Sequence, residues 1–431
     1  MSGASAPGTS KLVMNQRQRA IWPVIIVAAF FEGFDDSVIN IALPYIKTSF
    51  AINDQMAGYI LSLAAIGTLL AFFASRLADN FGRRRVFLWC VYLYAISSLL
   101  TAVSFWLPMF IAMQFLARTF LIGCWSTGYV IVCEEFPTEH RGTAVGRFQV
   151  TAVFGGLLVG VLLPLVAHTG LGWRTLYIVG ALPIIPVFLM RNRLAETQQF
   201  QKLVAERVAG AKASKETFFA AWHRPHLKYL LVMAVVWFFM YFGVKGSLNF
   251  FSTRVVDELS WTPMMVSIAV LTSTLGGIAI IAFNGTLLDK LGRKPAAALV
   301  ISVGSVFGVV TFLSTNTIVI ILCNIICVGC MNSLLIIGST LTNELFPTEV
   351  RSNAMAWTNN AAGRFGQILV PLFATNGLWV TLGHGVAVAM VLPLISLVFI
   401  AVFLPETSAK ATRIESGETP EPALVDSTSI N

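Results

Sequence analysis

Two short motifs each occur twice in this chain, and both pairs of copies stand the same distance apart. The first motif reads SRLADNFGRRR at residues 75–85 and GTLLDKLGRK at residues 285–294, with its two aspartates 210 residues apart. The second reads EEFPTEHR at residues 134–141 and ELFPTEVR at residues 344–351, and its two prolines are also 210 residues apart. A fixed internal period of this kind indicates a tandem duplication, so the two halves should share one architecture.

Apolar residues dominate the chain to an extent that excludes an ordinary soluble protein. Of its 431 residues, 56% are hydrophobic and only 12% are charged, whereas soluble domains carry about 25% charged residues. Apolar runs of roughly 20 residues, the length that crosses a bilayer as a helix, recur from Trp22 to Leu404. Spanning segments are helices or closed barrels, and runs this continuous do not alternate as barrel strands do. The sequence therefore predicts an all-α membrane protein.

Six membrane spans are expected in each half. They lie near residues 21–46, 56–78, 86–104, 107–132, 144–167 and 173–191, and then near 228–252, 263–288, 296–313, 317–343, 353–378 and 381–404. This pattern predicts five regions: an N-terminal tail (1–20), a six-helix domain (21–191), a linker (192–227), a second six-helix domain (228–404) and a tail (405–431). The polar linker should be partly amphipathic helix, and the last tail should be disordered.

The distribution of Lys and Arg predicts how the chain crosses the membrane. We place Lys47, Arg174 and Arg254 in outer loops and three further cations inside spans, which leaves 23 of the 29 Lys and Arg residues on one side. Because positive charge accumulates on the cytoplasmic side, the linker and both termini should be cytoplasmic. The expected location of the protein is the cell (inner) membrane. The net charge of +8 thus has an explanation that does not involve nucleic acid as a partner.

The doubled loop motif, GxxxDxxGR(R/K) in outline, resembles the signature of the major facilitator superfamily, and the resemblance covers about residues 25–405. It implies twelve transmembrane helices in two six-helix domains, a central path lined by spans 1, 4, 7 and 10, and alternating access. The FPTE motifs and LPET at residues 404–407 resemble the metabolite:proton symporter branch. EGFD at residues 32–35 resembles a motif of aromatic acid:proton symporters, in which Asp is usual where Glu32 stands. However, DSVINIALP at residues 36–44 also resembles drug:proton antiporters.

The doubled motifs supply candidate residues for a latch between the halves. Their glycines suit tight turns, because glycine reaches left-handed conformations cheaply. An acid at a helix end accepts hydrogen bonds from a neighbouring helix N-terminus and pairs with Arg, and the resemblance implies a latch on the cytoplasmic side. The predicted latch residues are Asp79, Gly82, Arg83, Glu135, Arg141, Asp289, Gly292, Arg293, Glu344 and Arg351. The alternative for the arginines is a role as topology signals alone.

Three acids lie inside the first span, where a charge is costly unless it meets water or a partner. Glu32, Asp35 and Asp36 stand roughly 16–24 Å along the span, close to the middle of a hydrocarbon core about 30 Å thick. Spacings of three and four place Glu32 on one helix face with both aspartates. We predict that these acids couple transport to protons, and a buried structural ion pair is the alternative.

Three cations inside other spans are the natural counterparts of these acids. Lys245 follows Asp35 by 210 residues, Arg118 lies in the middle of span 4, and Arg364 lies in span 11. We predict that they attract an anionic substrate, with polar side chains beside them. The predicted substrate-binding residues are Lys245, Arg364, Arg118, Tyr241, Asn40 and Asn359.

These features predict a secondary transporter rather than an enzyme. The best-supported activity is proton-coupled uptake of a small organic anion or aromatic carboxylate. The sequence contains no P-loop, zinc-protease or dinucleotide motif, so we expect no metal and no cofactor, with the proton gradient as the energy source. The expected partners are a small-molecule substrate and the lipid bilayer, and the protein is expected to be a monomer. Two alternatives remain: proton-driven efflux of drugs or metabolites, and a transport-inactive receptor or sensor on the same fold.

Overall fold

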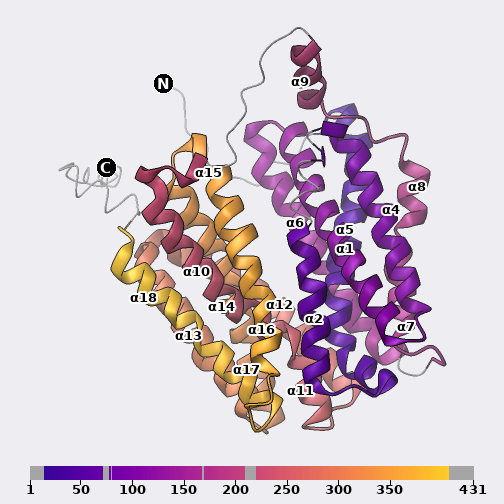
Figure 1. The fold of residues 1–431 in the computed structure, drawn as a ribbon, viewed down its shortest axis with the longest axis vertical. Helices are drawn as coiled ribbons and strands as arrows, with labels where there is room; N and C mark the ends of the chain where they lie inside the picture. The colour runs from indigo at the N-terminus through magenta and orange to yellow at the C-terminus, as the bar shows by residue number, and fades with distance from the viewer. Residues whose placement is uncertain (1–13, 71–76, 79, 167–168, 209–219, 407–431) are drawn as a thin grey trace, which may run out of the picture.

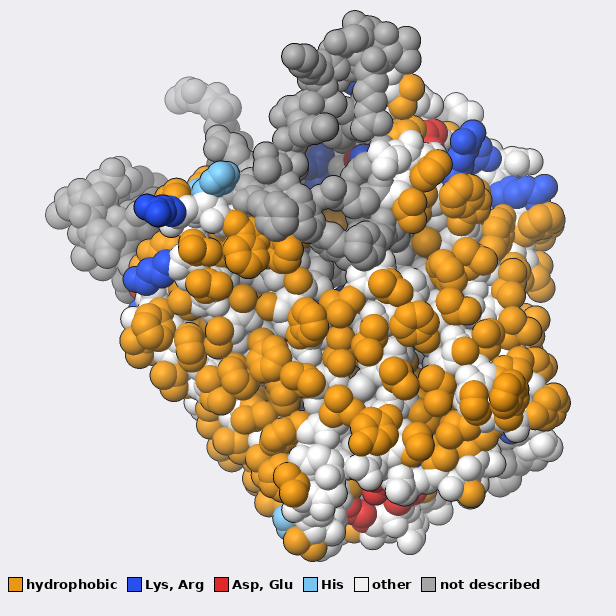
Figure 2. Space-filling view, viewed as in Figure 1, with side chains coloured by type: hydrophobic (Ala, Val, Ile, Leu, Met, Phe, Trp, Pro, Cys, Tyr) orange, Lys and Arg blue, Asp and Glu red, His pale blue; other side chains and the backbone are white. Residues whose placement is uncertain are grey.

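The computed structural model describes residues 14–70, 77–78, 80–166, 169–208 and 220–406. It is all-helical and consists of two helix bundles that follow one another along the chain (Figure 1). Within these ranges, eight helices are long and apolar enough to span a membrane. Figure 2 shows hydrophobic side chains over the flank of the molecule and charged side chains toward its two ends, as expected for a protein embedded in lipid.

The first bundle contains the helices up to the linker. They are α1 (Gln16–Phe50), α2 (Asp54–Leu70), α4 (Arg83–Ala102), α5 (Leu107–Glu135), α6 (Thr138–Val166), α7 (Arg174–Ala181) and α8 (Ile184–Met190). The linker contributes α9 (Gln198–Val208) and the 3₁₀ turn η1 (Ala220–Trp222). The predicted N-terminal and C-terminal tails lie largely outside the described residues.

The second bundle repeats this order. It contains α10 (Arg224–Asn249), α11 (Phe251–Asp257), α12 (Pro263–Leu291), α13 (Arg293–Leu313), α14 (Thr317–Leu345), α15 (Thr348–Met355), the π-helix η2 (Ala356–Gly363), α16 (Arg364–Ala374), α17 (Leu382–Val391) and α18 (Pro393–Phe403). The predicted span near residues 353–378 is thus a composite of α15, η2 and α16, because a π-helical stretch interrupts the α-helix.

Equivalent residues shape equivalent features in the two bundles. Gly82 and Gly292 precede α4 and α13, and both have φ of 97°, a conformation that glycine adopts without the clash of a Cβ atom. The last helix of each bundle is broken at a proline, Pro183 between α7 and α8 and Pro393 at the start of α18. These prolines are also 210 residues apart, and proline has no N–H to continue a helical ladder.

The two bundles meet at one end of the molecule and diverge toward the other (Figure 1). We name the end that carries α9, Gly82 and Gly292 the linker side, and the end that carries α11 the far side. Toward the far side, hydroxyl groups of one bundle donate to backbone carbonyls of the other: Ser62 Oγ to Ile368 O at 2.7 Å and Ser252 Oγ to Ile41 O at 2.7 Å. Such contacts hold the far side closed.

Two cations that the sequence places in outer loops instead lie inside helices with buried side chains. Lys47 belongs to α1 and its ammonium contacts the carboxylates of Asp54 and Asp257. Arg254 belongs to α11 and donates to Ser314 O at 2.7 Å, with Glu258 one turn away. The expectation of a loop is therefore wrong for both, because ion pairing compensates for burying the charge.

Candidate functional site

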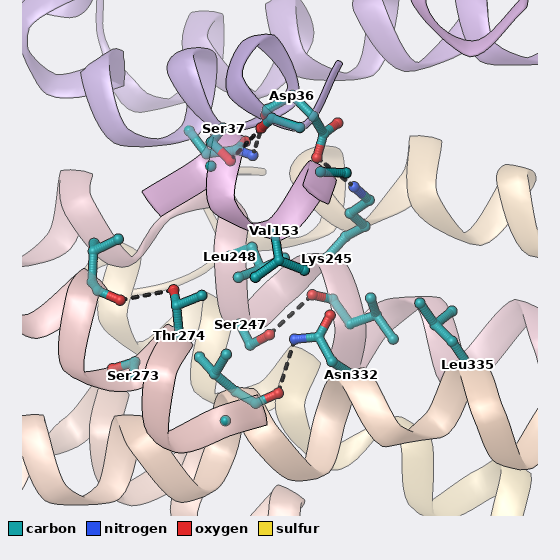
Figure 3. Close-up of a pocket in the computed structure, with 18 of the residues that line it drawn as sticks. Asp36, Ser37, Val153, Lys245, Ser247, Leu248, Ser273, Thr274, Asn332 and Leu335 are labelled. Atoms are coloured by element: carbon teal, nitrogen blue, oxygen red, sulfur yellow. Dashed lines mark hydrogen bonds and ion pairs between the residues drawn. The ribbon is translucent and has the colours of Figure 1, made fainter. Parts of the chain in front are cut away.

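A cavity of about 470 Å³ lies between the two bundles. Its walls come from α1, α5 and α6 on one side and from α10, α12, α14 and Arg364 on the other. Figure 3 shows how side chains of both bundles surround it. Its volume falls in the range of small-molecule binding sites, and the polar groups in its apolar wall determine what it selects.

Asp36 is the acid around which the charges of the cavity are organised. Its carboxylate pairs with the guanidinium of Arg118 from α5, and Lys245 Nζ lies 3.6 Å from its second oxygen. Figure 3 shows Lys245 extending from α10 toward Asp36. Asn40 lines the cavity and donates from its Nδ2 to the Asp36 carbonyl at 3.0 Å. Asp36 therefore links the two bundles through an ion pair at the cavity.

Asp35, also on α1, is buried and is not among the residues that line this cavity. Its carboxylate accepts a hydrogen bond of 3.0 Å from Ser98 Oγ of α4. Gly180 of α7 makes room for it, because a Cβ atom there would lie 2.9 Å from Asp35 Oδ1. Asp35 and Asp36 thus occupy different environments although they are neighbours in the sequence.

Glu32 lines the cavity on the α1 side, and its side chain makes no hydrogen bond or ion pair with any residue that the structure describes. Two cations beside the acid cluster, Arg118 and Lys245, pair with Asp36. Its carboxylate therefore remains available to a molecule inside the cavity.

Arg364 lines the opposite wall, at the point where η2 passes into α16. Its Nη1 donates to Gln367 Oε1 at 2.8 Å, and its guanidinium lies 5.7 Å from the centre of the Tyr241 ring. Tyr241 also lines the cavity, and its hydroxyl donates to Asn359 Oδ1 at 2.9 Å. Within the described residues, Arg364 has no carboxylate partner. It is therefore the cavity cation that remains free to bind an anion.

The π-helix η2 gives this wall its shape. It carries Asn359, and Gly363 packs so closely on Tyr241 that a Cβ atom there would lie 2.6 Å from the ring. Wide turns of this kind change the direction of the side chains that follow, and they recur at functional sites. The expected span near residues 353–378 did not include such a segment.

The latch candidates lie on the linker side, and the ion pairs that the described ones form stay within their own bundles. Arg83 Nε lies 3.2 Å from Glu134, and Arg293 Nη2 lies 2.7 Å from Glu344. Both arginines also donate to the end of the preceding helix, Arg83 to Ala78 O and Arg293 to Leu288 O, each at 3.2 Å. Asp79 lies outside the described residues, and Asp289 is exposed, with its Oδ1 3.6 Å from Arg293 Nη1. Arg141 is exposed near the start of α6. Arg351 donates from its Nε to the Phe346 carbonyl at 3.4 Å.

Glu134 rather than Glu135 occupies the place equivalent to Glu344. Glu135 instead pairs with Arg17 at 2.9 Å, and thereby ties the start of α1 to the end of α5. Sequence analysis missed Glu134, although it stands 210 residues before Glu344 and the repeat therefore pointed to it.

Two further glutamates on the linker side were also missed. Glu196 accepts from the backbone N–H of Arg84 at 3.1 Å, and Glu406 accepts from those of Arg293 and Lys294 at 2.7 and 2.9 Å. Each glutamate therefore satisfies free N–H groups at the start of a helix, where negative charge is also favoured. They too stand 210 residues apart, in LAET at residues 194–197 and LPET at residues 404–407, so the repeat carried a signal for them.

Comparison with known proteins places this chain in a family. The sequence profile of the Major Facilitator Superfamily matches residues 25–371 and, in a second match, residues 238–428. The chain belongs to the Major Facilitator Superfamily. Its all-helical fold resembles the crystal structure of a D-xylose-proton symporter with a TM-score of 0.74 and 18% identity, over 91% of this chain and 99% of that one. The fold of this superfamily has twelve transmembrane helices, which confirms the predicted fold class.

Relatives of this superfamily member transport small metabolites. It is 24% identical to a niacin transporter of Acinetobacter baylyi, over 91% of this chain and 94% of the relative. It is 25% identical to a 3-(3-hydroxy-phenyl)propionate transporter of Escherichia coli, over 83% of this chain and 86% of the relative. The protein is thus a multi-pass membrane protein and a secondary transporter of small metabolites, not an enzyme.

Proposed function

We propose that this transporter takes up a small organic anion, of the aromatic carboxylate class, together with protons. The observation that carries the proposal is Arg364, a guanidinium in the cavity wall without a carboxylate partner among the described residues. A guanidinium binds a carboxylate with two parallel hydrogen bonds, and the Tyr241 ring beside it offers a surface for a flat substrate. Two relatives, one named as a niacin transporter and the other as a 3-(3-hydroxy-phenyl)propionate transporter, support the same substrate class.

Proton coupling rests on the acids of α1. Asp35 is a buried carboxylate held by the Ser98 hydroxyl, and Glu32 faces the cavity. Moving a cation away from a carboxylate favours its protonated form. When the substrate draws Lys245 away from Asp36, less positive charge faces the acids of α1, and they therefore take up a proton more readily. In this scheme, Asp35 carries the proton, and Glu32 and Asp36 control when it does so.

The closed side and the predicted orientation together identify the state of the transport cycle that this structure represents. The Lys and Arg distribution puts the linker side in the cytoplasm of the cell, with both termini. The far side, where Ser252 meets Ile41, then faces outward and is shut in this structure. The structure therefore represents a state that exchanges substrate with the cytoplasm, one half of an alternating-access cycle. We further propose that the monomer is the transporting unit, because its cavity is complete within one chain.

Purified protein in proteoliposomes tests the proposal. With an inward proton gradient, labelled benzoate or 4-hydroxybenzoate should accumulate inside, and collapse of the gradient with a protonophore should abolish accumulation. Accumulation driven by the opposite gradient would instead support efflux, and binding without any flux would support a receptor or sensor. If no aromatic carboxylate binds or moves, the substrate class proposed here is wrong.

A further inference from the structure

Among the residues that the structure describes, the cavity wall contains one charged side chain of each sign without an ion-pair partner, and the two stand on opposite walls. Asp36 occupies both Arg118 and Lys245, and Asp35 is bonded to Ser98 outside the cavity lining. Within the described part of the chain, this leaves the Glu32 carboxylate without a partner and Arg364 without a carboxylate. An ionised group at membrane depth is costly unless water or a partner satisfies it. A substrate that satisfies both groups is therefore favoured over one that satisfies Arg364 alone.

We propose that Glu32 determines specificity by accepting a hydrogen bond from a donor group on the substrate. This inference rests on the proposed function and deepens it: the preferred substrates are aromatic carboxylates that also carry a hydroxyl group. The carboxylate binds Arg364 of the second bundle, and the hydroxyl donates to Glu32 of the first. Asp35 then carries the proton, and Glu32 recognises the substrate.

The surroundings of the two groups fit such a ligand. Trp125 of α5 lines the cavity on the same side as Glu32 and stacks on Phe148 at 4.4 Å between ring centres, whereas Tyr241 lies beside Arg364. Aromatic side chains in the cavity wall of both bundles suit a flat ring between them. Because Glu32 and Arg364 belong to different bundles, a ligand held at both ends also bridges the two halves that must move together during transport.

The alternative is that Glu32 has a structural role only. A structural carboxylate would have partners in the protein, as Asp36 and Asp35 have, and Glu32 lacks them among the described residues. A site built to hydrogen-bond a substrate hydroxyl also rejects analogues that lack it, because the buried acceptor then stays unpaired. Discrimination between a hydroxyl and its methyl ether is thus a readout that a structural role does not produce.

The experiment compares two pairs of acids by calorimetric titration of the purified full-length protein: 3-hydroxybenzoate with 3-methoxybenzoate, and 4-hydroxybenzoate with 4-methoxybenzoate. Each methyl ether keeps the ring, the carboxylate and an acceptor oxygen but loses the donor. We expect at least one hydroxy acid to bind about tenfold more tightly than its ether, which corresponds to about 1.4 kcal/mol. Glu32→Leu should bring this ratio close to one, and Glu32→Gln should keep part of it, because the amide oxygen still accepts.

The possible outcomes separate this inference from the proposed function. Binding of all four acids without discrimination, or an unchanged ratio in Glu32→Leu, would overturn the role of Glu32 and leave the carboxylate proposal standing. Failure of all four to bind would overturn both. If Glu32→Leu does not fold, Glu32→Asp replaces it, because the shorter side chain withdraws the acceptor and should also lower the ratio. An unchanged ratio there would count equally against the inference.

Discussion

Lys47 on α1 and Asp257 on α11 occupy equivalent positions in the two halves, 210 residues apart, and form an ion pair that joins the halves. Asp54, at the start of α2, adds a second carboxylate to the same ammonium from within the first half. The pair lies on the far side. The hydrogen bond from Ser252 to Ile41 joins the same two helices, α11 and α1. For that side to open, the contact between Lys47 and Asp257 must break.

Removing this pair should favour the state that is open on the far side. Asp257→Asn leaves Lys47 with Asp54 but removes the attraction between the halves. Because Asp257 is partly exposed, we expect at most about 1 kcal/mol, which is up to about fivefold in the population of the open state. A cysteine introduced at Leu248, in the cavity wall, should react correspondingly faster with an impermeant thiol reagent from the far side.

Asp54→Asn is the matched control for Asp257→Asn. It removes a carboxylate from the same ammonium, but Asp54 and Lys47 belong to the same half. Labelling at position 248 should therefore change less than in Asp257→Asn. Equal labelling in both variants would show that Lys47 is a local structural residue and not a contact that governs opening.

Asp35→Asn should abolish accumulation driven by a proton gradient and leave exchange of substrate across the membrane. The amide keeps the size of the carboxyl and can still meet Ser98, but it cannot take up a proton at physiological pH. Proteoliposomes measure both processes with the same labelled acid. Ser98→Ala is the control, because it removes the hydrogen bond and keeps the carboxyl, so accumulation should persist. Full accumulation by Asp35→Asn would exclude this residue from the coupling.

Arg364→Gln should weaken binding of aromatic acids more than Lys245→Gln does. Arg364 lacks a carboxylate partner among the described residues, whereas Lys245 already faces Asp36 at 3.6 Å. Losing a charge-assisted hydrogen bond typically costs about 1.5–3 kcal/mol, or roughly ten- to a hundredfold in affinity. In Lys245→Gln, Asp36 retains Arg118, so the protein should still fold. Arg364→Lys should restore little, because an ammonium lacks the planar fork. Equal affinity of Arg364→Gln and the parent for benzoate would contradict the organic-anion assignment.

The repeat and the apolar runs were sufficient to predict six spans in each half, because hydrophobic length and a fixed period are properties of the sequence alone, and the superfamily fold was implied by the resemblance of the doubled loop motif. The sequence did not predict which neighbour faces the cavity. Asp35 and Asp36 are separated by about 100° around a helix, and only packing decides that Asp36 meets Lys245 while Asp35 meets Ser98. The position equivalent to Lys245 is Asp35, yet the ion pair is made by its neighbour.

The features that sequence reasoning missed depend on contacts between side chains and on local helix geometry. Glu134, Glu196 and Glu406 act through pairing with Arg83 or with helix N-termini, and only their 210-residue spacing marked them in advance. The π-helix η2 had no marker of this kind. Lys47 and Asp257 do stand 210 residues apart, but that spacing alone did not show that they form an ion pair. The close approach of Gly363 to Tyr241 is visible only in three dimensions, and a lysine near the end of an apolar run looks like a loop residue until its partners are known.

The two capping glutamates yield the last prediction, which concerns stability. Glu406→Ala should lower the thermal stability of the second bundle, because the first N–H groups of α13 lose the carboxylate that accepts from Arg293 and Lys294. Loss of a helix cap typically costs ~1 kcal/mol. Glu196→Ala should have a smaller effect on α4, since the described contacts of Glu196 with that helix include one backbone N–H, that of Arg84, against two for Glu406. Thermal unfolding of the detergent-purified variants measures both changes, and Glu406→Gln should lie between the parent and Glu406→Ala, because the amide oxygen still accepts but carries no charge. If Glu406→Ala unfolds at the temperature of the parent, the carboxylate is not a cap that matters to the fold, and its repetition at position 196 needs a different explanation.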